Sequence, residues 1–253
     1  MNPEVLFRNV TKRFDPKGPL IVSDISLDIQ QGEFVSIIGP SGCGKSTLLK
    51  LVAGLTPCTS GEILVNNLAP AQAREQVSFV FQDATLLPWR TVEQNVALAL
   101  ELERRPIAES KSLIGALLEL VGLSHVAKSY PRQLSGGMKM RTSIARALAT
   151  RPRLLLMDEP FAALDEITRD RMNEELLRLR EEQNWTVLFV THSVAEAVFL
   201  ASKVIILAPH PGRIAHILDI NLPAPRTALT RESQAFDDLV NQTSRLLRET
   251  HRA

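Results

Sequence analysis

The segment GPSGCGKST, from Gly39 to Thr47, constrains the fold of this chain more than any other feature of the sequence. It follows the apolar run FVSII (34–38) and precedes TLLKLVAGL (47–55), in which the leucines recur at helical spacing. The glycines between these stretches mark a turn, because glycine is unfavourable in the interior of a strand or a helix. A buried strand that passes through a glycine-rich turn into a helix is a basic unit of an α/β sheet.

Three further apolar runs resemble the first: VSFVF (77–81), LLLM (154–157) and TVLFV (186–190). Their hydrophobicity is continuous rather than alternating, which predicts strands buried on both faces of a parallel sheet layered by helices. A polar residue or pair follows each run: Gln82, then Asp158 and Glu159, then Thr191 and His192. Because parallel strands end together at the edge where ligands bind, we expect these residues and the glycine loop to form one site.

Size and charge restrict the class of protein. The chain has 253 residues, of which 45% are hydrophobic, enough for one large domain or a domain with an additional lobe. Lys and Arg number 29 and Asp and Glu 28, and this net charge of +1 disfavours nucleic acid as a partner. Two cysteines, Cys43 and Cys58, do not form the pattern of a disulfide framework, which favours a reducing compartment. No apolar run approaches the ~18–20 residues of a membrane span, and MNPEVLFRNV lacks the features of a secretory signal. We therefore expect a cytosolic protein that can dock on a membrane partner.

The middle of the chain is helical in pattern. TVEQNVALALEL and KSLIGALLELVGL carry apolar residues at spacings of three and four. We expect a helical lobe, approximately residues 84–150, inserted between strands of the sheet.

The end of the chain combines a linker with an amphipathic helix. PHPGRI and LPAPR, beyond Ala208, are rich in Pro and Gly. The following TRESQAFDDLVNQTSRLLRET places one set of residues on a single helical face: Phe236, Leu239, Val240, Thr243, Leu246 and Leu247. This divides the chain into a main domain (1–212) and a linker with a C-terminal helix (213–253). Packing of that helix on its own domain or a sister subunit is the preferred interpretation, and a regulatory role is the alternative.

The glycine segment is a candidate phosphate-binding loop, because it matches G-x-x-x-x-G-K-[ST] in the required strand–helix context. Backbone N–H groups of the loop would surround the β- and γ-phosphates, Lys45 would add a positive charge, and Ser46 would offer its hydroxyl to Mg²⁺. Thr47 can add a further phosphate contact. The remaining residues of this predicted site are Gly39, Pro40, Ser41, Gly42, Cys43 and Gly44. Cys43 occupies a variable position of the pattern, and a chance glycine-rich turn is the alternative interpretation.

The strand-end residues complete a candidate hydrolytic site. Asp158 is placed to hold Mg²⁺ through water, and Glu159 is a candidate base that polarises the attacking water. An acidic pair that only caps the next helix is the alternative. Gln82 can orient water or Mg²⁺, and His192 can hydrogen-bond the γ-phosphate. Each of these two residues, taken alone, is also consistent with an ordinary polar strand end.

A second anion-binding pattern lies in LSGGMKMRTSIARAL, from Leu134 to Leu148. Its first turn consists of Ser135, Gly136 and Gly137, and a helix that begins in this way presents unpaired N–H groups and a partial positive charge. One nucleotide does not require two such sites.

The combined motifs resemble those of the ATP-binding cassette (ABC) ATPases over the first ~210 residues, because loop, Gln, LSGG, Asp-Glu and His occur in that family's order. The resemblance implies an α/β P-loop NTPase with a mostly parallel sheet, an N-terminal antiparallel β subdomain and an inserted helical subdomain. It also explains the second pattern. In that family the LSGG turn of one subunit completes the ATP site of another, so two copies would enclose two ATP molecules.

Other segments follow the family with departures. FRNVTKRFD resembles the adenine-stacking region, with Phe14 where tyrosine is common, and stacking is preserved by a phenyl ring. FAALD resembles the loop that communicates between the two sites and carries Asp165, but Ala162 replaces a common serine. Met140 occupies a position that is usually polar, which puts a side-chain contact with the partner's nucleotide or Gln loop in doubt.

The segment QDATLLPWRTVEQNV, from Gln82 to Val96, is similar to that of importer ATPases for nitrate, sulfonates, taurine and bicarbonate. It is also similar to that of some importers of thiamin-precursor pyrimidines. In such transporters the Gln loop and helical lobe meet a short cytoplasmic helix of the membrane permease. The resemblance implies an apolar contact surface here, made of Leu86, Leu87, Pro88 and Trp89. Burial of Trp89 within the helical lobe is the alternative.

These inferences predict a homodimeric ATPase that uses ATP and Mg²⁺, lies peripherally on the cytoplasmic face of the inner membrane, and drives a permease fed by a periplasmic solute-binding protein. The cargo would be a small anion or organic solute of the nitrate, sulfonate or taurine type. One alternative is a soluble cassette ATPase that acts on nucleic acid or ribosomes, although such relatives carry long insertions or two cassettes. Another is a small-molecule kinase or GTPase, which would leave the LSGG turn and His192 without a role.

Overall fold

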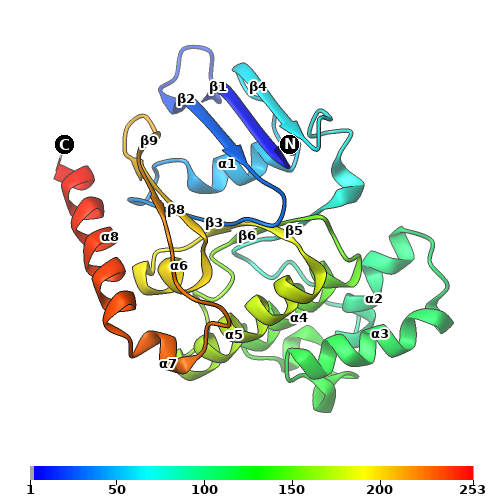
Figure 1. Cartoon of the computed structure of the whole chain (residues 1–253). Coiled ribbons are helices and arrows are strands. Elements are labelled where there is room, and N and C mark those ends of the chain that lie inside the picture. Colours follow the sequence, from blue (N-terminus) through cyan, green and yellow to red (C-terminus); the bar gives the residue numbers. More distant parts are fainter. Residues whose placement is uncertain (1–2, 253) are drawn as a thin grey trace.

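The computed structural model describes residues 3–252, except for the side chains of residues 107–109, 181, 182 and 252. Figure 1 shows two sheets above a layer of helices, with a helical lobe to one side. The larger sheet has the strand order β5-β6-β7-β3-β8-β9, and all its neighbours are parallel except β8 and β9. Its strands are β3 (Phe34–Ile38), β5 (Val77–Val80), β6 (Leu154–Asp158), β7 (Thr186–Val190), β8 (Lys203–Ala208) and β9 (Arg213–Asp219).

The predicted buried strands form the centre of this sheet. Every residue of β3, β6 and β7 is buried, because the sheet is covered on both faces. β5 lies at one edge, and only its last residue, Val80, is buried. Two bounds differ by one residue from expectation, since β5 ends before Phe81 and β6 includes Asp158. The ends of β5, β6, β7 and β3 are neighbours, so the segments that follow them meet at one edge.

The smaller sheet is antiparallel and has the order β2-β1-β4. Its strands are β1 (Val5–Arg13), β2 (Leu20–Ile29) and β4 (Ser60–Val65). In β1 the residues Val5, Phe7 and Val10 are buried, and most of those between them are more exposed, because one face packs on the core. The helix α1 (Lys45–Val52) lies between the two sheets and shares an apolar cluster with both (Figure 1). The predicted α/β class with an antiparallel subdomain is therefore confirmed.

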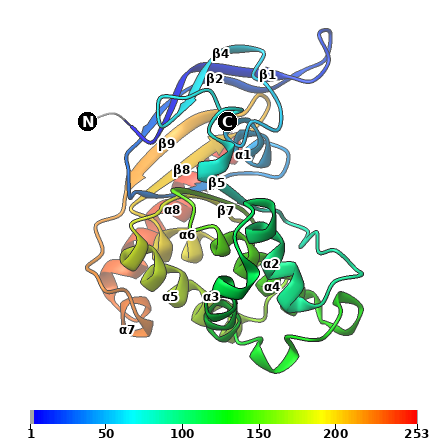
Figure 2. The ribbon, with the colours of Figure 1, turned by 90° about the vertical axis from the view of Figure 1, so that its right-hand side faces the viewer.

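The helical lobe lies below and beside the central sheet (Figure 2). It contains α2 (Val92–Leu102), α3 (Ile107–Leu120), α4 (Gly136–Ala149) and the 3₁₀ turns η2 (Ser124–Val126) and η3 (Pro131–Gln133). A further turn, η1 (Arg74–Gln76), precedes β5. A capping box starts α2, in which the Thr91 and Gln94 side chains each accept from the other's backbone N–H. The lobe packs with α5 (Glu166–Gln183) and α6 (Val194–Leu200) in one apolar cluster under the sheet.

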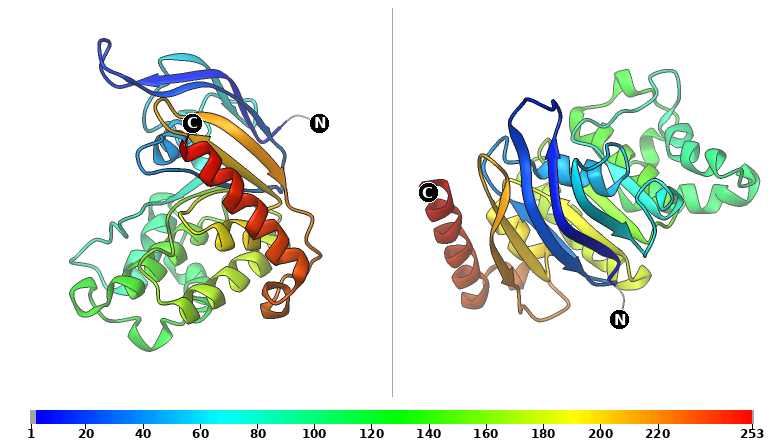
Figure 3. Two further views of the ribbon diagram at one scale, coloured as in Figure 1. Left: turned by 90° about the vertical axis from the view of Figure 1, so that its left-hand side faces the viewer. Right: turned by 90° about the horizontal axis from the view of Figure 1, so that it is seen from above.

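The C-terminal part differs from expectation at residues 213–219. They form β9, which pairs antiparallel with β8 at the sheet edge, rather than a linker. An edge strand is half exposed, so its apolar pattern is weak, and the Pro and Gly of PHPGRI form the turn between β8 and β9. After a short α7 (Ala228–Arg231), α8 (Gln234–Arg252) runs along the side of the domain (Figure 3). Its Phe236 is buried and its predicted apolar face packs on the main cluster, as the interpretation of packing on its own domain requires.

Candidate nucleotide site

The loop between β3 and α1 has a shape that requires glycine at two positions. At Gly44, where φ is 96°, an added Cβ would lie 2.7 Å from Cγ2 of Val22. At Gly39 it would lie 2.7 Å from the carbonyl oxygen of Leu207. Gly42 also has positive φ, but its Cβ position faces open space. The loop is thus closed against the protein on one side and open on the other, as a backbone that surrounds a phosphate must be.

Lys45 occupies the centre of this loop. Its ammonium donates to the carbonyl oxygens of Gly39 and Pro40, at 2.9 Å each, and the residue is buried. Cys43 is buried as well, and burial raises the pKa of its thiol. A buried thiol with a raised pKa has little thiolate character and is therefore a weak nucleophile.

Ser46 and Asp158 meet at the loop's end. The Ser46 hydroxyl donates to Oδ1 of Asp158 at 2.9 Å, and Asp158 is buried at the end of β6. Burial raises the pKa of the Asp158 carboxyl, whereas this hydrogen bond opposes the shift. A hydroxyl and a carboxylate oxygen so close together fit Mg²⁺, which uses few protein oxygens beside phosphate oxygens and water.

Glu159 is held between two neighbouring loops. Its Oε1 lies 2.6 Å from Nε2 of His192, and its Oε2 accepts from Nε2 of Gln82 at 3.3 Å. The Glu159 backbone has φ of 50°, an unusual conformation for a residue other than glycine, and its N–H donates to the carbonyl of Val190. The structure therefore brings together three of the predicted strand-end residues, from the carboxyl ends of β5, β6 and β7.

The LSGG turn is not part of this group. Ser135 is the N-cap of α4, where its hydroxyl accepts from the Met138 N–H at 3.3 Å, and Ser135 and Gly136 are exposed. Within residues 3–252, no hydrogen bond joins this turn to the phosphate loop. The turn thus presents a helix N-terminus to the outside of the protomer. Gly137 faces Leu164, and a Cβ at Gly137 would lie 2.9 Å from that leucine's Cδ2.

The remaining candidates lie at the periphery. Phe14 is 63% exposed, and the Lys12 ammonium lies 4.9 Å from its ring centre. Asp165 is the N-cap of α5, and the hydrogen bond from the Thr168 N–H lowers the pKa of its carboxyl. Ala162 is exposed, whereas Met140 is buried in the lobe. The side chain of Met140 therefore belongs to the apolar core of the lobe.

The Gln loop is fixed by a residue that sequence analysis did not identify, Asn95. Asn95 is fully buried in α2, its Oδ1 accepts from the Leu87 N–H at 2.8 Å, and its amide donates to the carbonyls of Leu87, Arg90 and Thr91. An asparagine among the apolar residues of a predicted helix is the signal that could have found it. Trp89, at the tip of this loop, is 69% exposed, so the interpretation that it is buried within the lobe is wrong.

Arg146 of α4 is a second such residue. Its guanidinium donates to the carbonyls of Ala84 and Thr85 and to the Thr85 hydroxyl, and burial lowers its pKa. It connects the helix that starts at Ser135 with the loop that starts at Gln82.

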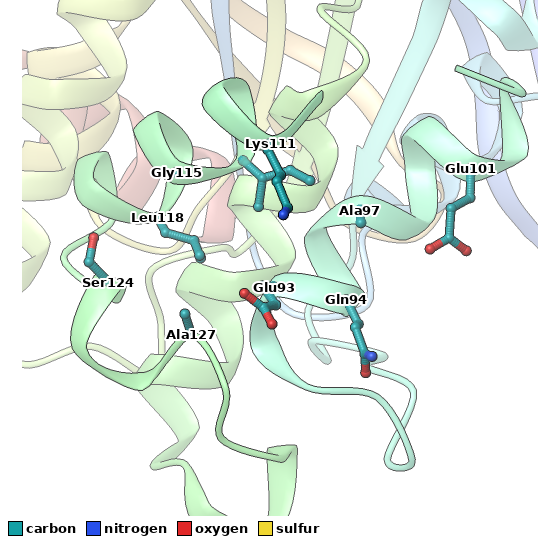
Figure 4. Close-up of a pocket in the computed structure, with 10 residues that line it drawn as sticks. Glu93, Gln94, Ala97, Glu101, Lys111, Gly115, Leu118, Ser124 and Ala127 are labelled. Carbon is teal, nitrogen blue, oxygen red and sulfur yellow. The ribbon is translucent and has the colours of Figure 1, made fainter. Parts of the chain in front are cut away.

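A cavity of about 450 Å³ opens between α2 and α3 next to this loop (Figure 4). Ala97, Leu118 and Ala127 give it apolar walls, and Figure 4 also shows charged residues around it, including Glu93 and Lys111. Arg90, which follows Trp89, donates at 2.7 Å to Oε2 of Glu101, another lining residue. The exposed loop and the cavity are therefore parts of one surface.

Comparisons with known proteins agree with this geometry. A family model described as ABC transporter matches residues 22–162. A nitrate import ATP-binding protein of Synechococcus elongatus is 44% identical over 92% of this chain, and the match covers 36% of that longer protein. An aliphatic sulfonates import ATP-binding protein of Bacillus cereus is 41% identical over 87% of this chain and 85% of its own length. Among solved structures, a dimeric ATP-binding cassette, MJ0796, bound to ADP and Pi has a TM-score of 0.79 and 33% identity, covering 87% of this chain and 100% of that one.

Proposed function

The chain belongs to the ABC transporter family, and we propose that it is the ATP-hydrolysing subunit of an importer for a small anion or organic solute of the nitrate, sulfonate and taurine type. The observation that carries the assignment is the position of Glu159, held by Gln82 and His192 beside the Ser46–Asp158 pair. The similar importer subunits and the near-neutral charge favour this function over action on nucleic acid or ribosomes.

The site residues have distinct roles in this proposal. The loop N–H groups and Lys45 bind the phosphates of ATP, and Thr47 adds a contact. Ser46, Asp158 and Gln82 are the residues that would hold Mg²⁺, which supplies neutralisation of phosphate charge when bound. Glu159 takes the proton of the attacking water, and His192 orients Glu159 and hydrogen-bonds the γ-phosphate. Phe14 stacks on the adenine.

A second copy of the chain completes each site. Ser135 and Gly136 are exposed at a helix N-terminus that no hydrogen bond ties to the phosphate loop of the described chain, and the similar cassette MJ0796 is dimeric. Helix N-terminal N–H groups bind anions, so this turn is suited to the γ-phosphate bound by a partner. Asp165, in the loop packed against Gly137 through Leu164, then lies beside the interface.

The permease docks at the exposed Gln loop. Trp89 is 69% exposed and Pro88 is exposed, on a backbone that Asn95 fixes, whereas Leu86 and Leu87 are half-buried beside them. No helix within residues 3–252 is long and apolar enough to cross a membrane. The likeness to import ATP-binding proteins supports a peripheral location on the cytoplasmic face of the inner membrane, where a periplasmic solute-binding protein acts indirectly through the permease.

A mixing experiment tests the shared site. Lys45→Ala removes the loop charge, and Ser135→Arg blocks the opposing helix start, so each variant alone should be inactive. A heterodimer of the two contains one site with an intact loop and an intact LSGG turn, so mixing should restore ATPase activity in proportion to the share of heterodimers, with one active site in each. If mixing restores nothing while dilute monomeric wild-type protein hydrolyses ATP as fast per chain as concentrated protein, the shared site is refuted.

A further inference from the structure

The C-terminal segment, defined here as residues 220–252, contacts the short helix α6 at the end of the helix and at the Phe199 ring. Arg226 donates to the carbonyl oxygens of Phe199 at 2.9 Å and Ala201 at 2.7 Å, at the end of α6 where carbonyl groups lack helical partners. The guanidinium of Arg231 lies 3.6 Å from the ring centre of Phe199. Phe236 of α8 meets the same ring edge-on. Figure 3 shows α8 running past this helix.

Glu196 lies on α6 one turn before Phe199, so both side chains face the same side of the helix. Glu196 is 5% exposed, and its Oε2 accepts a hydrogen bond from the Thr191 hydroxyl. Its Oε1 is buried without a hydrogen-bond partner within the described part of the chain. Burial raises the pKa of the Glu196 carboxyl, and the nearby charges of Arg169 and Arg231 oppose the shift. The Thr191 hydroxyl therefore donates to this carboxylate, and the Arg231 guanidinium lies over the Phe199 ring one turn further along α6.

Each of these arginines reaches another segment. Arg231 forms an ion pair with Oδ1 of Asp170 at 3.0 Å, which anchors the C-terminal segment to α5. Arg169 donates to the carbonyl of Leu164 at 2.9 Å, in the loop just before Asp165. Glu196 thus stands where the C-terminal segment and the Asp165 loop approach α6.

Thr191 connects Glu196 with the neighbouring residue His192. Its hydroxyl accepts from the Ser193 N–H at 3.0 Å while donating to Glu196, so the backbone on both sides of His192 is fixed by one side chain. The His192 ring is 50% exposed and has little packing around it. Its 2.6 Å contact with Glu159 therefore depends on the position of its backbone.

We propose that Glu196 is a positioning residue that links Arg231 of the C-terminal segment, through Thr191, to the catalytic His192. The contacts of the C-terminal segment with α6 then affect the rate of ATP hydrolysis, in addition to burying apolar surface. The inference rests on the proposed role of His192 in ATP hydrolysis.

The test measures kcat and KM for ATP in the full-length chain with two pairs of variants. Thr191→Val keeps the shape but removes the hydroxyl, and Thr191→Ser restores it. Arg231→Met keeps an unbranched side chain but removes the guanidinium that lies over Phe199, and Arg231→Lys restores a positive charge. We expect Thr191→Val and Arg231→Met to lower kcat by about 10-fold, because small displacements of catalytic groups have effects of this order. KM should stay within about 2-fold, because neither residue contacts the nucleotide. Thr191→Ser and Arg231→Lys should recover most of the rate.

A double variant separates positioning from general damage. If Thr191 acts through His192, Thr191→Val should lower kcat no further in a His192→Ala background. Arg8→Met is the matched control, since it removes an exposed ion pair with Glu62 on the smaller sheet. Unchanged kcat in Thr191→Val or Arg231→Met, or losses that add to that of His192→Ala, would overturn the inference. The inference would also be overturned if Thr191→Val and Arg231→Met changed kcat, KM and the melting temperature together, and if Thr191→Ser and Arg231→Lys did not restore the rate. A normal rate in His192→Ala would instead refute the proposed role of His192.

Discussion

Nε2 of His192 lies 2.6 Å from Oε1 of Glu159, although the two residues follow different strands and are separated by the whole of α5 and β7. The contact joins the ends of β6 and β7, which are paired in parallel register with Asp158 opposite Val190. The glutamate proposed as base is consequently not a free surface carboxylate. Its two oxygens have separate partners, His192 and Gln82, which hold the carboxylate between the segments that follow β5 and β7.

Replacing Glu159 tests its role as base. Glu159→Gln keeps the shape and one acceptor oxygen but removes the carboxylate that can take a proton. We expect ATP binding to persist and hydrolysis to fall by at least ~10²-fold, the contribution of a positioned base. ATP-bound dimers should accumulate in gel filtration. Glu119→Gln, at an exposed site on α3, is the control. Near-normal turnover of Glu159→Gln would remove Glu159 from this role.

The strands at the centre of the sheet could be predicted because both their faces are buried. FVSII and TVLFV match β3 and β7 to the residue, because short continuous apolar runs of this length, rich in β-branched and aromatic residues, favour strands buried on both faces. β9 could not be predicted in this way. In RIAHILD the polar residues Arg213, His216 and Asp219 recur at every third position, which does not match the two-residue period of a strand. The strand forms at the sheet edge, where it pairs with β8.

The candidate site likewise contains residues whose positions could be predicted from the sequence and residues whose positions could not. The residues that meet at the sheet edge follow from strand order, because parallel strands end together. Strand order does not predict the roles of Asn95 and Arg146, because these side chains donate hydrogen bonds to carbonyl groups of a loop without regular structure. Nor did LLPW alone decide between an exposed and a buried Trp89, because tryptophan suits both environments.

Lys45→Ala should weaken ATP binding. The ammonium is buried within the loop and would make charge-assisted hydrogen bonds to phosphate, each worth roughly 1.5–3 kcal/mol, so the Kd should rise by about 10- to 100-fold. Isothermal titration with ATP measures this change. Lys128→Ala removes a similar charge from an exposed position of the helical lobe and should leave the Kd unaltered. An unchanged affinity in Lys45→Ala would contradict the phosphate-binding role.

Trp89→Ala should separate hydrolysis from transport. The ring is exposed and makes no part of the lobe's core, so basal ATPase activity and the melting temperature should stay near wild type. Transport in vesicles that contain the permease should fall strongly if the ring contacts the permease. Leu102→Ala, at another exposed apolar residue of the lobe, should transport normally. Loss of the fold in Trp89→Ala would instead indicate a structural role.

Asn95→Leu should destabilise the protein because it removes the hydrogen bonds of the Asn95 amide to Leu87, Arg90 and Thr91. The Leu87 N–H and the carbonyls of Arg90 and Thr91 would lose a partner, at about 1–3 kcal/mol for each group left buried. We expect the free energy of unfolding in urea to fall by roughly 2–4 kcal/mol. Gln94→Leu tests an adjacent capping amide and should cost only about 1 kcal/mol. Equal stabilities of the two variants would show that Asn95 does not fix the loop.

Asp158 should make the stability of the nucleotide-free protein depend on pH. Burial raises the pKa of its carboxyl above the unfolded value of about 3.9, so the folded state holds the proton more tightly. The contribution of Asp158 to the free energy of unfolding therefore falls as pH rises from the unfolded pKa to the raised folded pKa, and it stays constant at higher pH. Asp158→Asn keeps a hydrogen-bond acceptor for Ser46 but cannot titrate. In urea unfolding, its stability relative to wild type should rise as pH increases from the unfolded pKa through the raised folded pKa of Asp158, and should then stay level. A difference that does not change with pH would show that the carboxyl is not shifted upward.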